Sequence, residues 1–142
     1  MYFLSFLFSC HVADTEKRSG AEVYQTFCIH CHQANGQGVP TRYPPLNGSQ
    51  WLKGTIPIKI VLHGLKGPIE VNGETYNNVM APWGNVLTDQ EIANVIMYIR
   101  TSWNNSATYN KEPAITSDDV KNIREKFKGA SNWTIEKAQS TQ

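Results

Sequence analysis

Residues 28–32 read Cys-Ile-His-Cys-His, and this C-x-x-C-H spacing is the strongest chemical signal in the chain. On a helical turn, two thiols three residues apart face the same way. They can then add to the two vinyl groups of a haem as thioethers, while the adjoining histidine ligates the iron. We therefore predict one covalently attached haem c, bound through Cys28 and Cys31, with His32 as the proximal iron ligand.

Two other chemistries use cysteines at this spacing. A structural zinc site needs four ligands, but outside the motif only Cys10 offers a thiol, and the chain has no second C-x-x-C pair. A thioredoxin-like redox pair follows a strand in a β-α-β pattern, and no such pattern surrounds residues 28–31. The haem interpretation is therefore favoured over both.

Three side chains are candidates for the second axial position on the iron: Met80, Met97 and His63. Met97 lies roughly 140° from the centre of the apolar stripe in its predicted helix, so it points away from the core. A lone histidine such as His63 more often forms a hydrogen bond or lies at the surface, although as a ligand it would give a bis-histidine centre of lower potential. Met80 lies in a loop followed by Pro82, is free to reach the iron, and is the predicted ligand.

A histidine and methionine pair would fill both axial positions with protein atoms. A thioether stabilises ferrous iron relative to ferric iron, so such a pair raises the reduction potential. Because no coordination position then remains for oxygen or a substrate, we predict one-electron transfer and no catalysis by the protein itself. The alternative is a haem enzyme or a gas-sensing haem protein with a labile sixth ligand.

The composition limits the other classes of function. The 142 residues allow one domain with appendages, and 40% hydrophobic residues suffice for a small core around a haem. The net charge of +1 and the lack of a basic run argue against nucleic acid as a partner. With two of the three cysteines assigned to haem, Cys10 needs an explanation of its own.

The N-terminal residues look like a targeting segment. Residues 1–10 are mostly apolar but too short to span a bilayer, and they are similar to the end of a secretory signal. Residues 7–10, Leu-Phe-Ser-Cys, resemble a bacterial lipobox whose cysteine is acylated, although Phe8 is larger than usual there. We interpret residues 1–18 as a signal or lipobox remnant with a polar tether. The alternative is a short signal with a coincidental cysteine.

Two capping boxes predict the starts of two helices. Ser19 is followed by Glu22 and Thr88 by Glu91, each pair at the spacing that satisfies the first free N–H groups of a helix. The first helix carries apolar residues at helical spacing as far as Cys31 and so delivers the cysteines. The second presents an apolar stripe made by Ile92, Val95, Ile96, Ile99 and Trp103.

The remaining segments give shorter signals. Glycines and a proline in residues 35–40 end the first helix, and residues 57–62 favour a short helix with Pro57 in its first turn. Residues 69–76 alternate around Asn-Gly, the preferred pair for a tight β-hairpin turn. The polar C-terminal part predicts a weaker helix opening at Thr116 and a last turn near Trp133.

The order of these features resembles a class I cytochrome c, from about Ser19 to Trp103. A helix leads into C-x-x-C-H, loops follow, a methionine lies in a late loop, and a last helix crosses the first. The resemblance implies an all-α fold wrapped around one haem, with a short β-hairpin flap and a helical C-terminal tail. It divides the chain into the tether at 1–18, a cytochrome c domain at 19–103 and a C-terminal extension at 104–142.

Residues 63–84, ending in Met-Ala-Pro-Trp-Gly, look like a bacterial subgroup of these cytochromes. Members of that subgroup transfer electrons beside periplasmic dehydrogenases, reductases or terminal oxidases. This implies a carrier or cytochrome subunit at the periplasmic or extracytoplasmic face of a bacterial membrane, with Cys10 as a lipid tether. Ala81 departs from the subgroup, which more often has proline after the methionine, and makes the loop less stiff.

The resemblance also assigns residues around the haem. The carbonyl of Pro44 is expected to accept the Nδ1 proton of His32, which presents Nε2 to the iron. Trp83 is assigned to the haem-binding residues. Two further pairs match the contact between the first and last helices: Gly20 and Tyr24 on the first helix, and Val95 and Tyr98 on the last.

Overall fold

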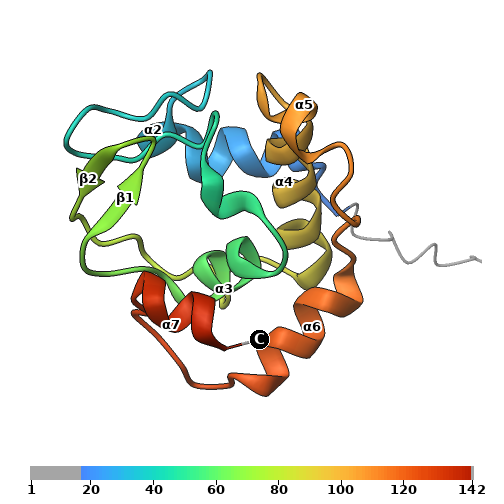
Figure 1. Cartoon of the computed structure of the whole chain (residues 1–142). Helices are drawn as coiled ribbons and strands as arrows, with labels where there is room; N and C mark the ends of the chain where they lie inside the picture. The colour runs from blue at the N-terminus through green and yellow to red at the C-terminus, as the bar shows by residue number, and fades with distance from the viewer. Residues whose placement is uncertain (1–16, 142) are drawn as a thin grey trace, which may run out of the picture.

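The computed structural model describes residues 17–141, a mainly helical body with one small sheet (Figure 1). This confirms the predicted fold class. Residues 1–16 of the predicted signal and tether at 1–18, including Cys10, lie outside the described residues. In the described range no helix is long and apolar enough to cross a membrane. The elements are α1 (Gly20–Val23), the π-helical turn η1 (Tyr24–Cys28), α2 (Ile29–His32), the 3₁₀ turn η2 (Gln50–Leu52), α3 (Ile56–His63), β1 (Ile69–Val71), β2 (Glu74–Tyr76), α4 (Asp89–Thr101), α5 (Asn105–Tyr109), α6 (Ser117–Lys126) and α7 (Ile135–Ser140).

The first helix begins at the predicted capping box. The Ser19 hydroxyl accepts from the Glu22 N–H at 3.3 Å, and the Glu22 carboxylate accepts from the Ser19 N–H at 2.7 Å. The sequence pattern predicts one continuous α-helix to Cys31, and here the structure differs. At η1 the helix widens into a π-turn, in which the Ile29 N–H bonds to the carbonyl of Tyr24. The apolar residues keep the ordinary i, i+3, i+4 spacing of an α-helix through this turn, so the pattern does not reveal it.

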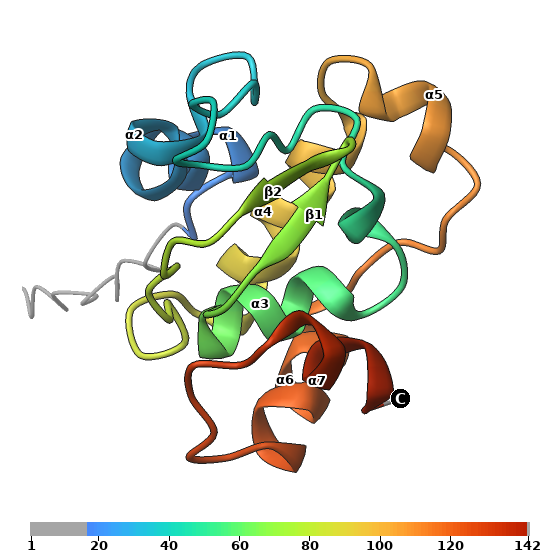
Figure 2. The ribbon, with the colours of Figure 1, turned by 60° about the vertical axis from the view of Figure 1, so that its left-hand side comes forward.

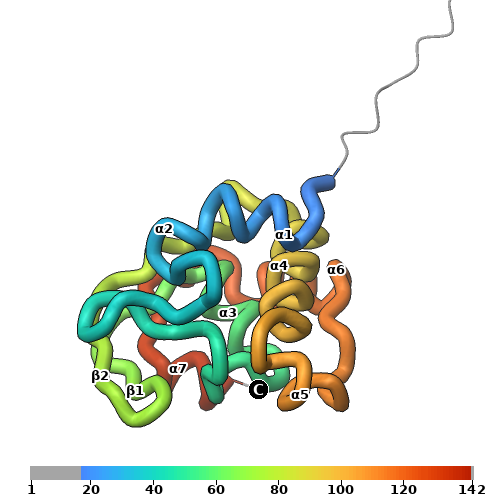
Figure 3. The backbone as a smooth tube through the Cα atoms, turned by 90° about the horizontal axis from the view of Figure 1, so that it is seen from above, coloured from blue at the N-terminus to red at the C-terminus, as the bar shows by residue number. Residues whose placement is uncertain are grey.

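The first helix crosses α4 at Gly20. A Cβ atom at this glycine would lie 2.2 Å from the Asn94 carbonyl oxygen and 2.6 Å from the Tyr98 Cβ. One turn later, the rings of Tyr24 and Tyr98 lie 5.5 Å apart. Figure 3 shows α1 against α4 from above. The predicted close approach at Gly20 is therefore confirmed.

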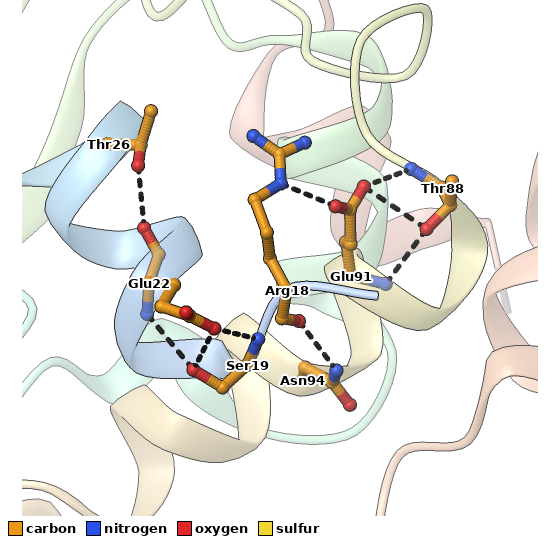
Figure 4. A network of polar contacts seen from close by, with 7 residues as sticks. All are labelled: Arg18, Ser19, Glu22, Thr26, Thr88, Glu91 and Asn94. Atoms are coloured by element: carbon orange, nitrogen blue, oxygen red, sulfur yellow. Dashed lines mark hydrogen bonds and ion pairs between the residues drawn. The ribbon is translucent and has the colours of Figure 1, made fainter. Parts of the chain in front are cut away.

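An ion pair locks the same crossing (Figure 4). Arg18 Nε lies 2.6 Å from the carboxylate of Glu91, and the Asn94 amide donates to the Arg18 carbonyl at 3.0 Å. Glu91 also completes the second predicted capping box with Thr88. The hydrogen bond from Arg18 is the main reason that the pKa of Glu91 falls to about 2. This contribution to stability is present above the ordinary pKa of glutamate and is lost as the pH falls toward 2.

The middle of the chain forms the predicted short helix and hairpin. Pro57 lies in the first turn of α3. Strands β1 and β2 pair antiparallel with Ile69 opposite Tyr76, and Asn72 and Gly73 make the turn with φ of 52° and 82°. Both residues therefore adopt the left-handed conformation that this turn requires. The hairpin and α4 stand on opposite sides of the molecule (Figure 1), and the hairpin lies above α3 in Figure 2.

The C-terminal residues cover the far side of α3. The predicted helix after Thr116 and the last turn after Trp133 are confirmed as α6 and α7, which lie below α3 in Figures 1 and 2. The side chain of Lys59 in α3 is only 2% exposed and donates to the carbonyls of Ala138 and Thr141 at 2.9 and 2.6 Å. A lysine thus fixes the end of α7 to α3 through the last free carbonyls of that helix.

Replacing Gly20 by leucine is expected to lower the free energy of unfolding of the haem-containing protein by about 1–3 kcal/mol, because α1 and α4 would be forced apart. Thermal unfolding measures the change. Ala21→Leu, at the exposed neighbouring position, is the matched control and should unfold almost like the wild type. Equal stability of wild type and Gly20→Leu would show that the helices do not meet at this residue.

Candidate haem-binding site

A cavity of about 300 Å³ lies between the end of α2, the hairpin and α4. Cys28, Cys31 and His32 line one part of it, and Met80 and Trp83 also line it. Its other walls are mostly apolar, and these residues come from almost every element before α5: Phe27, Pro44, Pro45, Leu46, Trp51, Leu52, Pro57, Ile60, Val61, Leu65, Ile69, Val71, Tyr76, Val95, Ile96 and Ile99. The fold therefore brings all of the predicted site residues to one apolar space.

His32 is held in a defined orientation. Its Nδ1 lies 2.9 Å from the carbonyl oxygen of Pro44. A carbonyl only accepts, so Nδ1 carries the proton and Nε2 keeps a free lone pair. Burial lowers the pKa of His32, which keeps the imidazole neutral as an iron ligand must be.

The loop after α2 folds back to bring Pro44 to His32. The Gly38 N–H donates to the His32 carbonyl at 3.0 Å, and Val39 pairs with Tyr43 in an isolated β-bridge. Gly38 has φ of 66°, and a Cβ atom there would lie 2.2 Å from the Tyr43 carbonyl oxygen. Only glycine fits this turn, so Gly38 is a local requirement for the contact between Pro44 and His32.

The two thiols do not have the surroundings of a redox pair. Burial, with a smaller effect of Cys31, raises the pKa of Cys28 to about 12, whereas reactive thiols have a lowered pKa. Within residues 17–141, no three His, Cys, Asp or Glu side chains are grouped to hold a metal ion. What remains is a pair of thiols, an imidazole and a thioether around an apolar space, and this donor set fits a covalently attached haem.

The Met80 backbone is fixed against the segment that follows α3. Leu65 and Met80 exchange two hydrogen bonds, of 3.0 Å from the Leu65 N–H and 2.8 Å from the Met80 N–H. Gly64, with φ of 71°, lies so close that a Cβ atom would be 2.6 Å from the Met80 carbonyl oxygen. Trp83 continues this contact, because its backbone N–H donates to the Val61 carbonyl at 2.8 Å.

The other two ligand candidates do not line the cavity. The sulfur of Met97 accepts from the Ile115 N–H at 3.3 Å, on another face of α4. His63 is the last residue of α3 and is 5% exposed. Its Nδ1 lies 3.0 Å from the Ala130 carbonyl, and its ring stacks on Trp133. The structure thus brings only Met80 of the three to the cavity.

Asn105, which the sequence reasoning missed, supports the loop after α2 that carries Pro44, here called the proximal loop. Its side chain is fully buried and donates to the carbonyls of Leu46 and Ile99, at 3.0 Å each. Its oxygen accepts from the Gly48 N–H at 2.7 Å. It lies in α5, which the sequence pattern also does not predict. No local signal distinguishes it from the exposed Asn104, because its partners in the loop that carries Pro44 are distant in the chain.

The fold and the cavity define a small helical domain that encloses an apolar prosthetic group beside C-x-x-C-H. The family model for cytochrome c matches residues 17–103. Cytochrome c-552 of Thermus thermophilus is 37% identical over 118 residues, which cover 75% of this chain and 85% of that protein. The chain belongs to the cytochrome c family. It is an electron-transfer protein that binds haem c covalently.

Two longer relatives match through part of their length. The cytochrome c subunit of the quinone alcohol dehydrogenase of Gluconacetobacter polyoxogenes is 31% identical over 116 residues, which cover 79% of this chain and 24% of that subunit. The cbb3-type cytochrome c oxidase subunit FixP of Sinorhizobium medicae is 33% identical over 87 residues, or 57% of this chain and 28% of that subunit. This chain therefore corresponds to about a quarter of each.

Replacing Asn105 by alanine is expected to cost about 2–4 kcal/mol of unfolding free energy, because three backbone groups would lose their partner. The loop carrying Pro44 should loosen as well and shift the reduction potential. Thermal unfolding and a redox titration measure the two effects. Asn104→Ala is the control and should change neither. Unchanged values in Asn105→Ala would mean that α5 does not support the proximal loop.

Proposed function

We propose that this protein is a one-electron carrier, or the cytochrome subunit of a redox enzyme, with His32 and Met80 as axial ligands of its haem iron. The observation that supports this most directly is that both side chains line the same apolar cavity as the two thiols. Cys28 and Cys31 form the two thioether links. The protein itself catalyses no reaction.

The side chains around the cavity suit this role. When bound, haem supplies an iron that alternates between the ferrous and ferric states. The soft thioether of Met80 favours the ferrous state, and the apolar walls keep water away, so both raise the reduction potential. The Pro44 carbonyl keeps the His32 imidazole in one tautomer. If His32 and Met80 both bound the iron, no position would remain on it for oxygen or a substrate.

We further propose redox proteins as partners. The names of two relatives place such a domain in a quinone alcohol dehydrogenase and in a cbb3-type oxidase. By analogy, a dehydrogenase, a reductase or a terminal oxidase would exchange electrons with this chain through a small, transient contact. Val79, which lines the cavity next to Met80 and is 68% exposed, offers apolar surface for such a contact. Nucleic acid is not a partner in this proposal.

The proposed location is the periplasm or the extracytoplasmic face of a bacterial membrane. The apolar residues 1–10 support export, and the lipobox-like residues 7–10 support a lipid tether at Cys10. Two or more acyl chains on one cysteine would be enough for stable membrane binding.

Replacing Met80 by alanine is expected to remove the sulfur-to-iron charge-transfer band of the ferric protein and to lower the reduction potential, because the soft ligand is lost. The reduced variant should then bind carbon monoxide rapidly, unlike the wild type. Absorption spectra, a redox titration and a carbon monoxide titration measure these changes.

Met97→Ala is the matched control, since its sulfur faces the Ile115 N–H and not the cavity. It should keep the wild-type spectrum. The opposite behaviour of the two variants would disprove the assignment of Met80. Rapid, stoichiometric carbon monoxide binding by the reduced wild type would instead favour a haem enzyme or gas sensor.

Intact-mass analysis of protein extracted from native membranes is expected to show a chain that begins at an acylated Cys10. Cys10→Ser should release the protein from the membrane and leave its haem spectrum unchanged, because the cysteine precedes the cytochrome c domain. Recovery of a soluble wild-type chain that retains residues before Cys10 would exclude the lipid tether.

A further inference from the structure

A backbone ladder connects the C-terminal extension to Met80. Leu65 pairs with Met80 in an antiparallel bridge and with Trp133 in a parallel bridge. On the side of Trp133, the backbone N–H of Lys66 donates to the Trp133 carbonyl at 2.7 Å. The backbone N–H of Trp133 donates to the Gly64 carbonyl at 3.3 Å. The segment after α3 is therefore held between Met80 and Trp133. We call Met80, Leu65 and Trp133 the Met80 ladder.

Packing fixes the indole of Trp133. The side chain is fully buried, and its ring stacks on His63 with 5.0 Å between the ring centroids. It also packs on Phe127 in a T-shaped arrangement, with 4.9 Å between centroids and an angle of 82° between the ring planes. Within the described residues, neither the indole N–H nor His63 Nε2 has a hydrogen-bond partner. An unpaired buried donor costs about 1–3 kcal/mol, so the ring is kept there by its contacts and not by a hydrogen bond of its own.

The extension is anchored on both sides of the ladder. At the end of α7, the Ala138 carbonyl accepts from Lys59 of α3 at 2.9 Å. On α6, Arg124 lies 2.7 Å from the Asp89 carboxylate and donates to the Leu87 carbonyl at 3.0 Å. It also donates to the carbonyl of Gly84, in the loop that continues from Met80. The extension therefore contacts the Met80 loop directly and through Leu65.

We propose that Trp133 is a positioning residue for Met80. It fixes the segment Gly64–Leu65–Lys66, which in turn fixes the Met80 backbone beside the cavity. This inference rests on the proposed role of Met80 as an iron ligand. It extends the redox site beyond residues 17–103, the part that the family model matches. The fraction of molecules in which Met80 leaves the iron is then set in part by a side chain of the extension.

The test compares variants of the full haem-containing protein. Trp133→Leu should weaken the sulfur-to-iron charge-transfer band, lower the reduction potential and speed carbon monoxide binding to the reduced protein about 2- to 30-fold, the range expected for a residue that couples indirectly to a site. Trp133→Phe keeps a ring against His63 and should restore values near those of the wild type. Val120→Ala, a buried change in α6 away from the ladder, should lower thermal stability and leave all three values unchanged.

Amide hydrogen exchange on the wild type provides a second test that needs no variant to fold. If the ladder opens as one unit, the N–H groups of Lys66 and Met80 should exchange with the same dependence on denaturant. Exchange of the Lys66 N–H while the Met80 N–H stays protected would overturn the inference. Trp133→Leu would also overturn it if the charge-transfer band, the reduction potential and the carbon monoxide rate all kept their wild-type values.

The same measurements separate this inference from the proposed function. If the charge-transfer band survives Met80→Ala, the proposed ligand itself is wrong. If the band depends on Met80 but not on Trp133, only this inference fails.

Discussion

The close crossing of α1 and α4 is the contact on which the rest of the site depends. Gly20 allows the two helices to touch, and the ion pair between Arg18 and Glu91 holds their starts together. The first helix then runs directly into the C-x-x-C-H motif, while α4 provides an apolar wall of the cavity through Val95 and Ile96. Both the attachment residues and the wall opposite the hairpin therefore take their positions from one helix contact.

The two proposed axial ligands are supported in different ways. His32 is oriented by a loop that lies close in sequence, through the Pro44 carbonyl, and Asn105 holds that loop from α5. Met80 is supported by α3 and by the C-terminal extension, whose Trp133 joins the same backbone ladder. A residue outside the part that the family model matches thus pairs with the same segment as Met80. If Trp133 positions Met80 as proposed, the extension contributes to the site as well as to the stability of the fold.

Features encoded by neighbouring residues could be predicted from the sequence. The capping boxes and the Asn72–Gly73 turn are signals of this kind, and both form as local geometry requires. The C-x-x-C-H motif is also a local signal, and its cysteines and final histidine lie together at the cavity. The π-turn at η1 was missed because the apolar residues keep ordinary α-helical spacing through it. The loop contacts of Asn105 and the ladder position of Trp133 were missed because those partners lie far away in the chain. Burial of a polar or aromatic side chain by distant segments leaves no local pattern.

Iron K-edge X-ray absorption of the native ferric protein tests the central claim most directly, because it identifies the atoms bound to the iron. The account predicts a sulfur ligand from Met80 together with nitrogen ligands from the haem and His32. In this account, the sulfurs of Cys28 and Cys31 would be bonded to the haem periphery and not to the iron, so they would not produce this signal. An iron with only nitrogen ligands, or with nitrogen and a labile oxygen ligand, would contradict the account.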